Sequence, residues 1–157
     1  MRKFILAAAL VLPCAPLAAQ SNDHVLRGDE AYAALRAADA LAHYEAAVSQ
    51  DSAGYDALWK ASRSLADLAE YEPDKSKRAD MYLRAERLAR LAVEANPDDA
   101  EAHFHLARAV GRVALSKGPK DRVKYGKIVR DQALETLRLD PEHPGGLHVM
   151  GMWHAEV

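Results

Sequence analysis

The stretch "ANPDDAEAHFHLARAV" (residues 95–110) recurs along the chain. "QDSAGYDALWKASRSL" (50–65) and "LDPEHPGGLHVMGMWH" (139–154) share its marks: an Asp or Asn followed by Ser or Pro, and then small and apolar residues at helical spacing. The marker positions Asp51, Asn96 and Asp140 lie 45 and 44 residues apart. A fixed period of this length is typical of arrays of stacked supersecondary units. The sequence therefore predicts a tandem repeat protein.

The composition favours an all-α fold. The chain of 157 residues is 50% hydrophobic but only 6% aromatic, and it is rich in Ala, Leu, Glu and Arg. β-Branched runs, which mark strands, are scarce. Such a chain is suited to burying the small faces of many helices.

The helical periodicity divides the chain into antiparallel helix pairs at about 21–52, 55–97 and 100–141, with a partial unit at 144–157. Pro73 closes one helix, and Gly118 with Pro119 interrupts another. We therefore expect long inter-helix loops at "EYEPDKSKRAD" (70–80) and "SKGPKDRVKYG" (116–126). The last unit reaches Val157 without a cap or a second helix. This predicts a piece of a longer protein, or a face that another molecule covers.

Residues 1–20 have the layout of a secretory signal peptide. Arg2 and Lys3 precede the apolar run 4–12, and cleavage is expected near Ala19 or Gln20, which leaves a domain at 21–157. An uncleaved anchor and lipidation of Cys14, the only cysteine, are the alternatives. We expect a periplasmic or extracellular protein without a stable membrane span after signal removal. Cleavage leaves 19 basic residues against 23 acidic ones, a net charge of −4, which does not suggest nucleic-acid binding.

The small and large residues of the units resemble the signature of tetratricopeptide repeats. The signature lies at Gly28, Ala40, Tyr44, Ala47, Leu58, Ala61, Ser62, Ala85, Ala92 and Pro97. The resemblance implies an α-solenoid. The alternative is a HEAT-type array, which has a similar repeat length but no reason for the Asn-Pro and Asp-Pro junctions.

Residues 55–157 are also similar to the regulator of microtubule dynamics family. The segments that carry this similarity are "DALWKASRSL", the run from "EANPDDAEAHFHLARAV" to "LETLRLDP", and "LHVMGMWHAEV". The family name implies microtubule association in eukaryotic members. An exported chain would not meet tubulin, and no tubulin-binding motif is recognisable, so only the architecture is carried over.

A solenoid of this kind presents the first helix of each unit on a concave surface. Arg63 and Arg108 occupy equivalent positions there, and aromatic residues accompany them. The sequence predicts a groove for a protein or peptide partner, including acidic ones, in which Arg forks hold carboxylates and aromatic side chains anchor apolar groups. In the alternative, the aromatic residues are packing residues and both Arg side chains pair with acids of neighbouring helices. The predicted groove residues are Trp59, Lys60, Arg63, Phe104, His105, Arg108, Arg112, His148 and Met152.

Catalytic and metal sites find little support in the sequence. His103 and His105 are two residues apart, so on a helix they point about 200° from one another and cannot share an ion. Ser62 and Ser64 lack a nucleophile-elbow context, and there is no glycine-rich phosphate loop. We therefore expect no cofactor, no metal and no enzymatic activity. Two functions remain: an exported interaction scaffold, or a repeat segment of a larger enzyme or secretion assembly.

Overall fold

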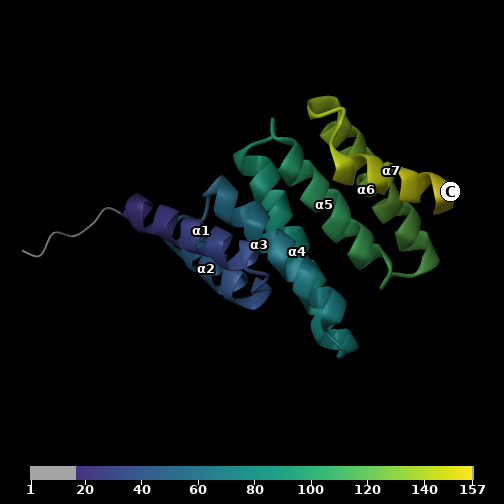
Figure 1. Ribbon diagram of the computed structural model, residues 1–157. Helices are drawn as coiled ribbons and strands as arrows, with labels where there is room; N and C mark the ends of the chain where they lie inside the picture. The colour runs from purple at the N-terminus through teal and green to yellow at the C-terminus, as the bar shows by residue number, and fades with distance from the viewer. Residues whose placement is uncertain (1–16, 157) are drawn as a thin grey trace, which may run out of the picture.

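A computed structural model describes residues 17–156, and every regular element in this range is an α-helix. Figure 1 shows the helices as antiparallel pairs, α1 with α2, α3 with α4 and α5 with α6, which follow one another in chain order and end with α7. This arrangement confirms the all-α solenoid. The helices are α1 (Leu17–Ala33), α2 (Ala37–Gln50), α3 (Tyr55–Tyr71), α4 (Lys75–Ala95), α5 (Ala100–Ala114), α6 (Pro119–Leu139) and α7 (Pro144–Glu156).

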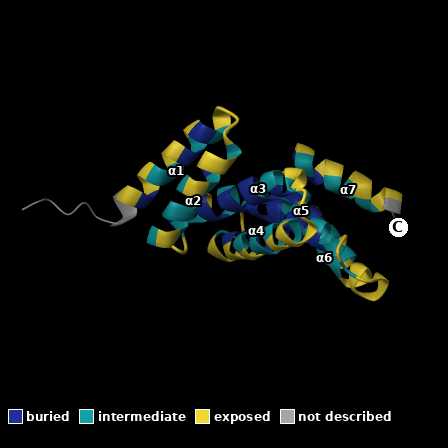
Figure 2. Ribbon diagram, turned by 90° about the horizontal axis from the view of Figure 1, so that it is seen from below, coloured by how far each residue is buried: buried dark blue, intermediate teal, exposed yellow. Residues whose placement is uncertain are grey.

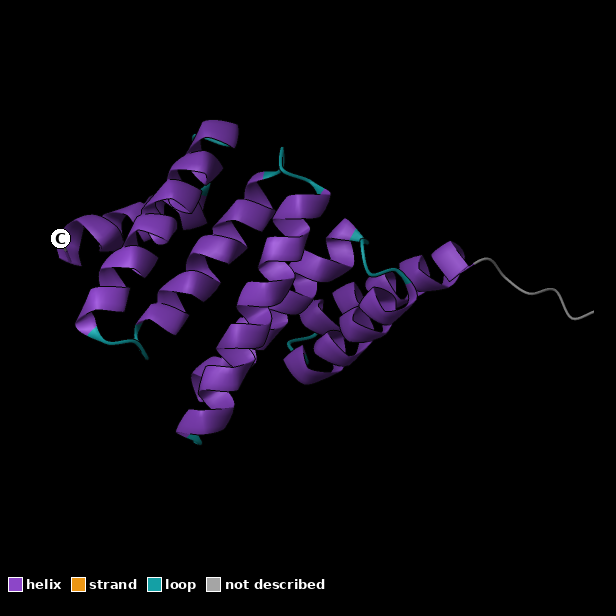
Figure 3. Ribbon diagram, turned by 180° about the vertical axis from the view of Figure 1, so that it is seen from behind, coloured by secondary structure: helices purple, strands orange, loops and turns teal. Residues whose placement is uncertain are grey.

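The prediction of long inter-helix loops is wrong. The α3–α4 connection is residues 72–74 and the α5–α6 connection is residues 115–118, as the short loops of Figure 3 show. Asp74 caps α4 by accepting hydrogen bonds from the backbone N–H groups of Ser76 and Lys77. Pro119 is the first residue of α6, where its missing N–H costs no hydrogen bond. The additional residues of these units therefore extend α4 and α6 to 21 residues each, against 14 in α2.

Alanine-sized side chains join the helices. Ala40, Ala61, Ala85, Ala89 and Ala102 are completely buried. Small side chains let neighbouring helices approach closely, and larger residues such as Leu58, Tyr44 and Val110 fill the remaining space. In Figure 2 the dark blue of buried residues is concentrated on α3 and α5.

The backbone of α1 approaches α2 closely at Gly28. A Cβ atom added at this position would lie 2.4 Å from Cε1 of Tyr44. The hydroxyl of Tyr44, whose side chain is completely buried, donates a hydrogen bond of 2.8 Å to Asp29. Glycine is therefore required at this crossing.

The first helices of the units, α1, α3, α5 and α7, form a row, in which α5 contacts both α3 and α7. α7, the last member, leaves large apolar side chains partly uncovered, with Leu147 53% and Met152 52% exposed. The predicted signal peptide falls mainly on residues 1–16, outside the described range, and residues 17–20 begin α1.

Candidate partner-binding site

The nine predicted groove residues all lie on first helices, namely α3, α5 and α7. The structure separates them into two groups. One group packs around Arg63 between α1, α3 and α5, and the other lines a cavity between α5, α6 and α7. The first group contains Trp59, Lys60, Arg63 and His105, and the second contains Phe104, Arg108, Arg112, His148 and Met152.

Arg63 is held by aromatic side chains. Its guanidinium carbon lies 3.5 Å from the ring centroid of Tyr32 on α1 and 5.0 Å from that of Trp59. One terminal nitrogen contacts the hydroxyl of Tyr44 at 3.4 Å, and Nε is buried without a hydrogen-bond partner among the described residues. Arg63 therefore stabilises the packing of α1 against α3 through a cation–π contact.

Trp59 and Lys60 also have partners within the chain. The indole of Trp59 stacks on the ring of His105, with centroids 5.3 Å apart and an interplanar angle of 13°. Its Nε1 donates a hydrogen bond to Asp56, and Nζ of Lys60 lies 2.8 Å from a carboxylate oxygen of Asp29. This part of the groove is already occupied by its own side chains.

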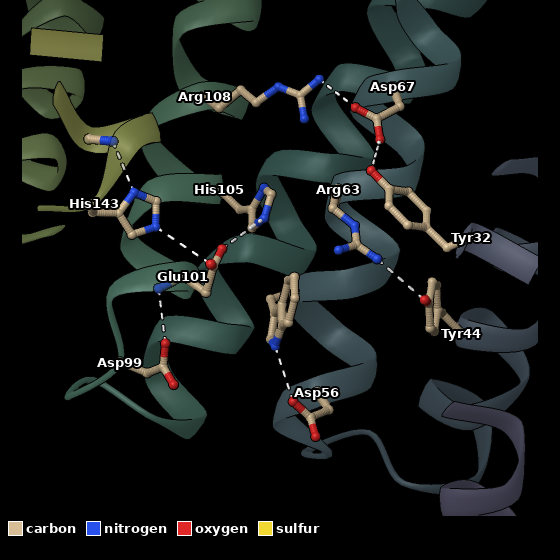
Figure 4. Close-up of polar contacts among 12 residues, drawn as sticks. Tyr32, Tyr44, Asp56, Arg63, Asp67, Asp99, Glu101, His105, Arg108 and His143 are labelled. Atoms are coloured by element: carbon tan, nitrogen blue, oxygen red, sulfur yellow. Dashed lines mark hydrogen bonds and ion pairs between the residues drawn. The ribbon is translucent and has the colours of Figure 1, made fainter. Parts of the chain in front are cut away.

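Arg108 pairs with acids of the preceding unit, which agrees for this residue with the alternative that the sequence left open. It donates a hydrogen bond of 2.6 Å to Asp67 (Figure 4) and another of 3.2 Å to Glu70. Arg112 donates to the same Glu70 at 2.7 Å. Since two carboxylates face these two guanidinium groups, the basic character expected of the groove is largely neutralised here.

Glu101 connects two buried histidines at the start of α5. Nε2 of His105 lies 3.4 Å from one carboxylate oxygen, and Nε2 of His143 lies 3.5 Å from the other. The backbone N–H of Gly146 donates to Nδ1 of His143, so the hydrogen of that ring belongs on Nε2 and faces Glu101 (Figure 4). Hydrogen bonding with His105 holds the pKa of the Glu101 carboxyl below its usual range, whereas burial lowers the pKa of His105. Both shifts fit a neutral His105 that donates Nε2–H to an ionised Glu101.

A cavity of about 420 Å³, here called the α5–α7 cavity, lies between α5, α6 and α7. The indole of Trp153 is fixed at its wall by a hydrogen bond of 3.1 Å from Nε1 to the carbonyl of Gly126. Arg122 donates to the backbone carbonyls of Leu115 and Lys117. The cavity thus combines apolar walls with guanidinium groups; its apolar lining includes Phe104, Val129, Val149, Met152 and Trp153.

His103 has two neutral acceptors near its ring. Its nitrogens contact Gln132 at 2.7 Å and the carbonyl of Pro97 at 2.9 Å.

Within residues 17–156, no group of three or more His, Cys, Asp or Glu side chains is placed to hold a metal ion. None of the described helices is both long enough and apolar enough to cross a membrane.

Comparison with known families covers nearly the whole chain. The family model described as regulator of microtubule dynamics protein 1-3 matches residues 22–157. The chain belongs to this family. Among its relatives, regulator of microtubule dynamics protein 3 of Rattus norvegicus is 26% identical over 102 residues, which are 65% of this chain and 22% of that protein. Regulator of microtubule dynamics protein 1 of Bos taurus is 24% identical over 105 residues, 66% of this chain and 33% of that protein. The chain thus matches a third or less of the length of these regulators.

Solved structures show the fold shared by this member of the regulator of microtubule dynamics family. The tetratricopeptide-repeat domain of Arabidopsis OM64 superposes with a TM-score of 0.68 at 13% identity, covering 90% of this chain and 99% of that domain. A thermophilic tetratricopeptide-repeat protein of Thermus thermophilus gives a TM-score of 0.70 at 18% identity, covering 86% of this chain and 64% of that one. The tetratricopeptide-like architecture is confirmed.

Several residues that contact the predicted groove residues, or line the α5–α7 cavity with them, were not predicted from the sequence. Tyr32 and Asp67 lie on first helices, so their register could have placed them beside Arg63 and Arg108. Arg122 and Val129 lie on α6, a second helix, and line the cavity, whereas only first helices were expected to contribute to the groove. Helical periodicity places Val129 on the apolar face of its helix, but it does not show that this face borders a cavity.

Proposed function

We propose that this chain is a non-catalytic interaction module that binds a peptide or protein segment along α5 and α7, with one apolar side chain of the partner in the α5–α7 cavity. The cavity is the observation that carries the proposal. Its volume of about 420 Å³ falls within the ~300–1,000 Å³ of ligand pockets. Phe104, Met152 and Trp153 supply the apolar and aromatic walls that such an anchor needs.

The guanidinium groups at this cavity favour a partner with an acidic residue beside its apolar anchor. Arg122 is exposed, and its hydrogen bonds within the described residues go to backbone carbonyls. Its charge is therefore open to a carboxylate of the partner. A buried apolar anchor contributes about 2 kcal/mol or more, while an exposed ion pair adds only about 0.2–1 kcal/mol. We expect weak binding, on the order of micromolar.

We also propose that the protein is exported. The basic and apolar pattern of residues 1–12 supports an export signal. Cleavage after Gln20 would retain Ser21, whose hydroxyl contacts the carbonyl of Ala47 at 3.4 Å. A mature N-terminus at or near Ser21, determined by mass spectrometry of the exported fraction, would support export. An intact Met1 in the cytoplasm would contradict it. An exported chain would not meet tubulin, so the microtubule role in the relatives' name is not expected of this protein.

The binding proposal can be tested by filling the cavity. Gly126 lines it, and a Cβ atom added there would meet no atom within 4 Å. A peptide is first selected on the wild-type protein from a displayed random library, and its dissociation constant is measured by fluorescence anisotropy. Gly126→Leu should weaken binding about tenfold or more, because it removes an anchor of about 2 kcal/mol.

Gly151→Leu is the matched control. Gly151 lies on α7, has open space around an added Cβ atom and does not line the cavity. Both variants replace a helical glycine with a better helix former, so both should retain the helical circular dichroism spectrum. Equal affinity of wild type and Gly126→Leu for every selected peptide would overturn the proposed site.

A further inference from the structure

A second cavity, here called the α4 cavity, lies where the α3–α4 connection meets the end of α5. Its volume is about 550 Å³, and it is open enough for a small ligand to enter. Three elements and one connection contribute its polar side chains. These are Lys75, Arg78 and Tyr82 of α4, Glu70 of α3, Arg112 of α5, and Ser116 of the α5–α6 connection.

The charges of this lining do not balance. Three cations face a single carboxylate, which leaves a net charge of +2. That carboxylate, Glu70, already accepts hydrogen bonds from Arg112 at 2.7 Å and Arg108 at 3.2 Å. Lys75 and Arg78 form no ion pair with any acid in residues 17–156. Two positive charges therefore remain available to a ligand.

Arg78 is held in position at the cavity. One of its terminal nitrogens donates a hydrogen bond of 3.0 Å to the backbone carbonyl of Glu72. The nearby acids Glu72 and Asp74 accept hydrogen bonds from backbone N–H groups at the start of α4. Neither acid forms an ion pair with Arg78 among the described residues. The other N–H groups of its guanidinium therefore remain available to a ligand.

Tyr82 adds a neutral hydrogen-bond donor. Its side chain is 9% exposed, and its hydroxyl has no hydrogen-bond partner among the described residues. Burial raises the pKa of this hydroxyl, so the group keeps its proton at neutral pH. A ligand oxygen at the cavity could accept from Tyr82 and from the cations together.

We propose that the α4 cavity binds a phosphate monoester. A phosphate monoester carries a charge of about −1.5 to −2 at neutral pH and offers three acceptor oxygens, which match the net +2 and the Lys, Arg and Tyr donors. The cavity is larger than a single phosphate group, and the rings and side chains of Tyr82, Ala79 and Leu115 offer apolar surface to the organic part. The same chemistry is present on small phosphate esters and on phosphorylated side chains.

This inference goes beyond the proposed peptide site. The two cavities share only Arg112 and Leu115.

Phenyl phosphate is a suitable probe, and isothermal titration calorimetry of the full chain should show saturable binding. Benzoate carries one negative charge on the same ring and matches only half of the excess positive charge. Its affinity should therefore be at least about tenfold lower than that of phenyl phosphate.

Two double variants separate site binding from general attraction to a basic surface. Lys75→Gln with Arg78→Gln should weaken phenyl phosphate binding about tenfold or more, because two charge-assisted contacts are lost. Lys77→Gln with Arg87→Gln removes the same charge from exposed positions of the same helix outside the cavity and should change the affinity less than about twofold. Gly126→Leu, which fills the other cavity, should leave it unchanged.

No saturable binding, equal loss in both double variants, or benzoate binding as tightly as phenyl phosphate would overturn the proposal. A phosphotyrosine peptide that binds more tightly than phenyl phosphate would assign the phosphate to a protein side chain, and weaker binding of that peptide would assign it to a small ester. Failure of the peptide site alone would show as unchanged peptide affinity in Gly126→Leu, with phenyl phosphate binding retained.

Discussion

Asp67 on α3 accepts a hydrogen bond of 2.6 Å from Arg108 on α5. The other oxygen of the same carboxylate accepts a hydrogen bond of 2.9 Å from the hydroxyl of Tyr32 on α1. One carboxylate thus joins the first helices of three consecutive units (Figure 4). Arg108, which occupies the position equivalent to Arg63 in the repeat, holds the solenoid together at this point. A charge reversal at Arg108 would therefore disturb stability as well as binding.

Asp67→Asn should lower the free energy of unfolding by about 2 kcal/mol, because a partly buried hydrogen bond to a charged group contributes about 1.5–3 kcal/mol. Urea unfolding followed by circular dichroism measures the change. Asp131→Asn is the control, since the pair of Asp131 with Arg130 is exposed and should contribute less than about 1 kcal/mol. Equal losses in the two variants would show that the Asp67 link is not structural.

Gly28→Ala and Gly126→Ala should have opposite effects on stability. The added methyl group at Gly28 meets the ring of Tyr44 at 2.4 Å, so overpacking should cost about 1–3 kcal/mol. At Gly126 the added methyl group meets no atom within 4 Å, and the gain in helix propensity should stabilise by up to about 1 kcal/mol. Thermal unfolding of both variants checks the pair of signs. If Gly28→Ala were as stable as the wild type, α1 and α2 would have to lie further apart than described.

The stability of the protein should fall on mild acidification because of His105. Burial lowers the pKa of His105 in the folded state, so below about pH 6.5 the unfolded chain binds a proton that the folded chain does not. Stability contributed by the neutral ring is present above that pH and is lost as the pH falls, by at most about 1.4 kcal/mol per pH unit. Urea unfolding at pH 7.5 and pH 5.0 measures this loss. The pKa of Glu101 is also lowered in the folded state, so the stability that this carboxylate contributes is lost mainly below pH 5, under the range compared.

His105→Phe is the matched variant, because it keeps an aromatic ring against Trp59 and removes the titrating group. Its free energy of unfolding should depend less on pH than that of the wild type. The same dependence in both proteins would rule out His105 as the source.

The repeat architecture could be predicted from the sequence, whereas the connections could not. The periodic small residues, such as Ala61 and Ala85, mark helix faces locally, and both are completely buried. Pro119 and the segment around Asp74 were interpreted as interruptions, although Pro is favourable in the first turn of a helix and Asp at its N-cap. The same residues that end one helix begin the next, and a local pattern does not give the length of the gap between them.

The sequence predicted on which helices the candidate groove residues lie, but not which side chains they contact. Repeat register placed Trp59, Phe104 and Arg108 on first helices, and the structure has them there. The partners of these side chains lie far away in sequence: Arg108 and Asp67 are 41 residues apart. Whether an arginine is free or paired depends on the rotation and stacking of the units, which single-helix patterns do not contain.

Photo-crosslinking of the selected peptide tests most directly whether the α5–α7 cavity is the binding site. Met152 lines the cavity and is 52% exposed, so Met152→p-benzoylphenylalanine places the reactive group at its mouth. Arg87, exposed on α4 and outside the cavity, provides the comparison position. Crosslinks from position 152 and none from position 87, mapped by mass spectrometry, are the predicted result. Crosslinks from position 87 and none from position 152 would contradict it.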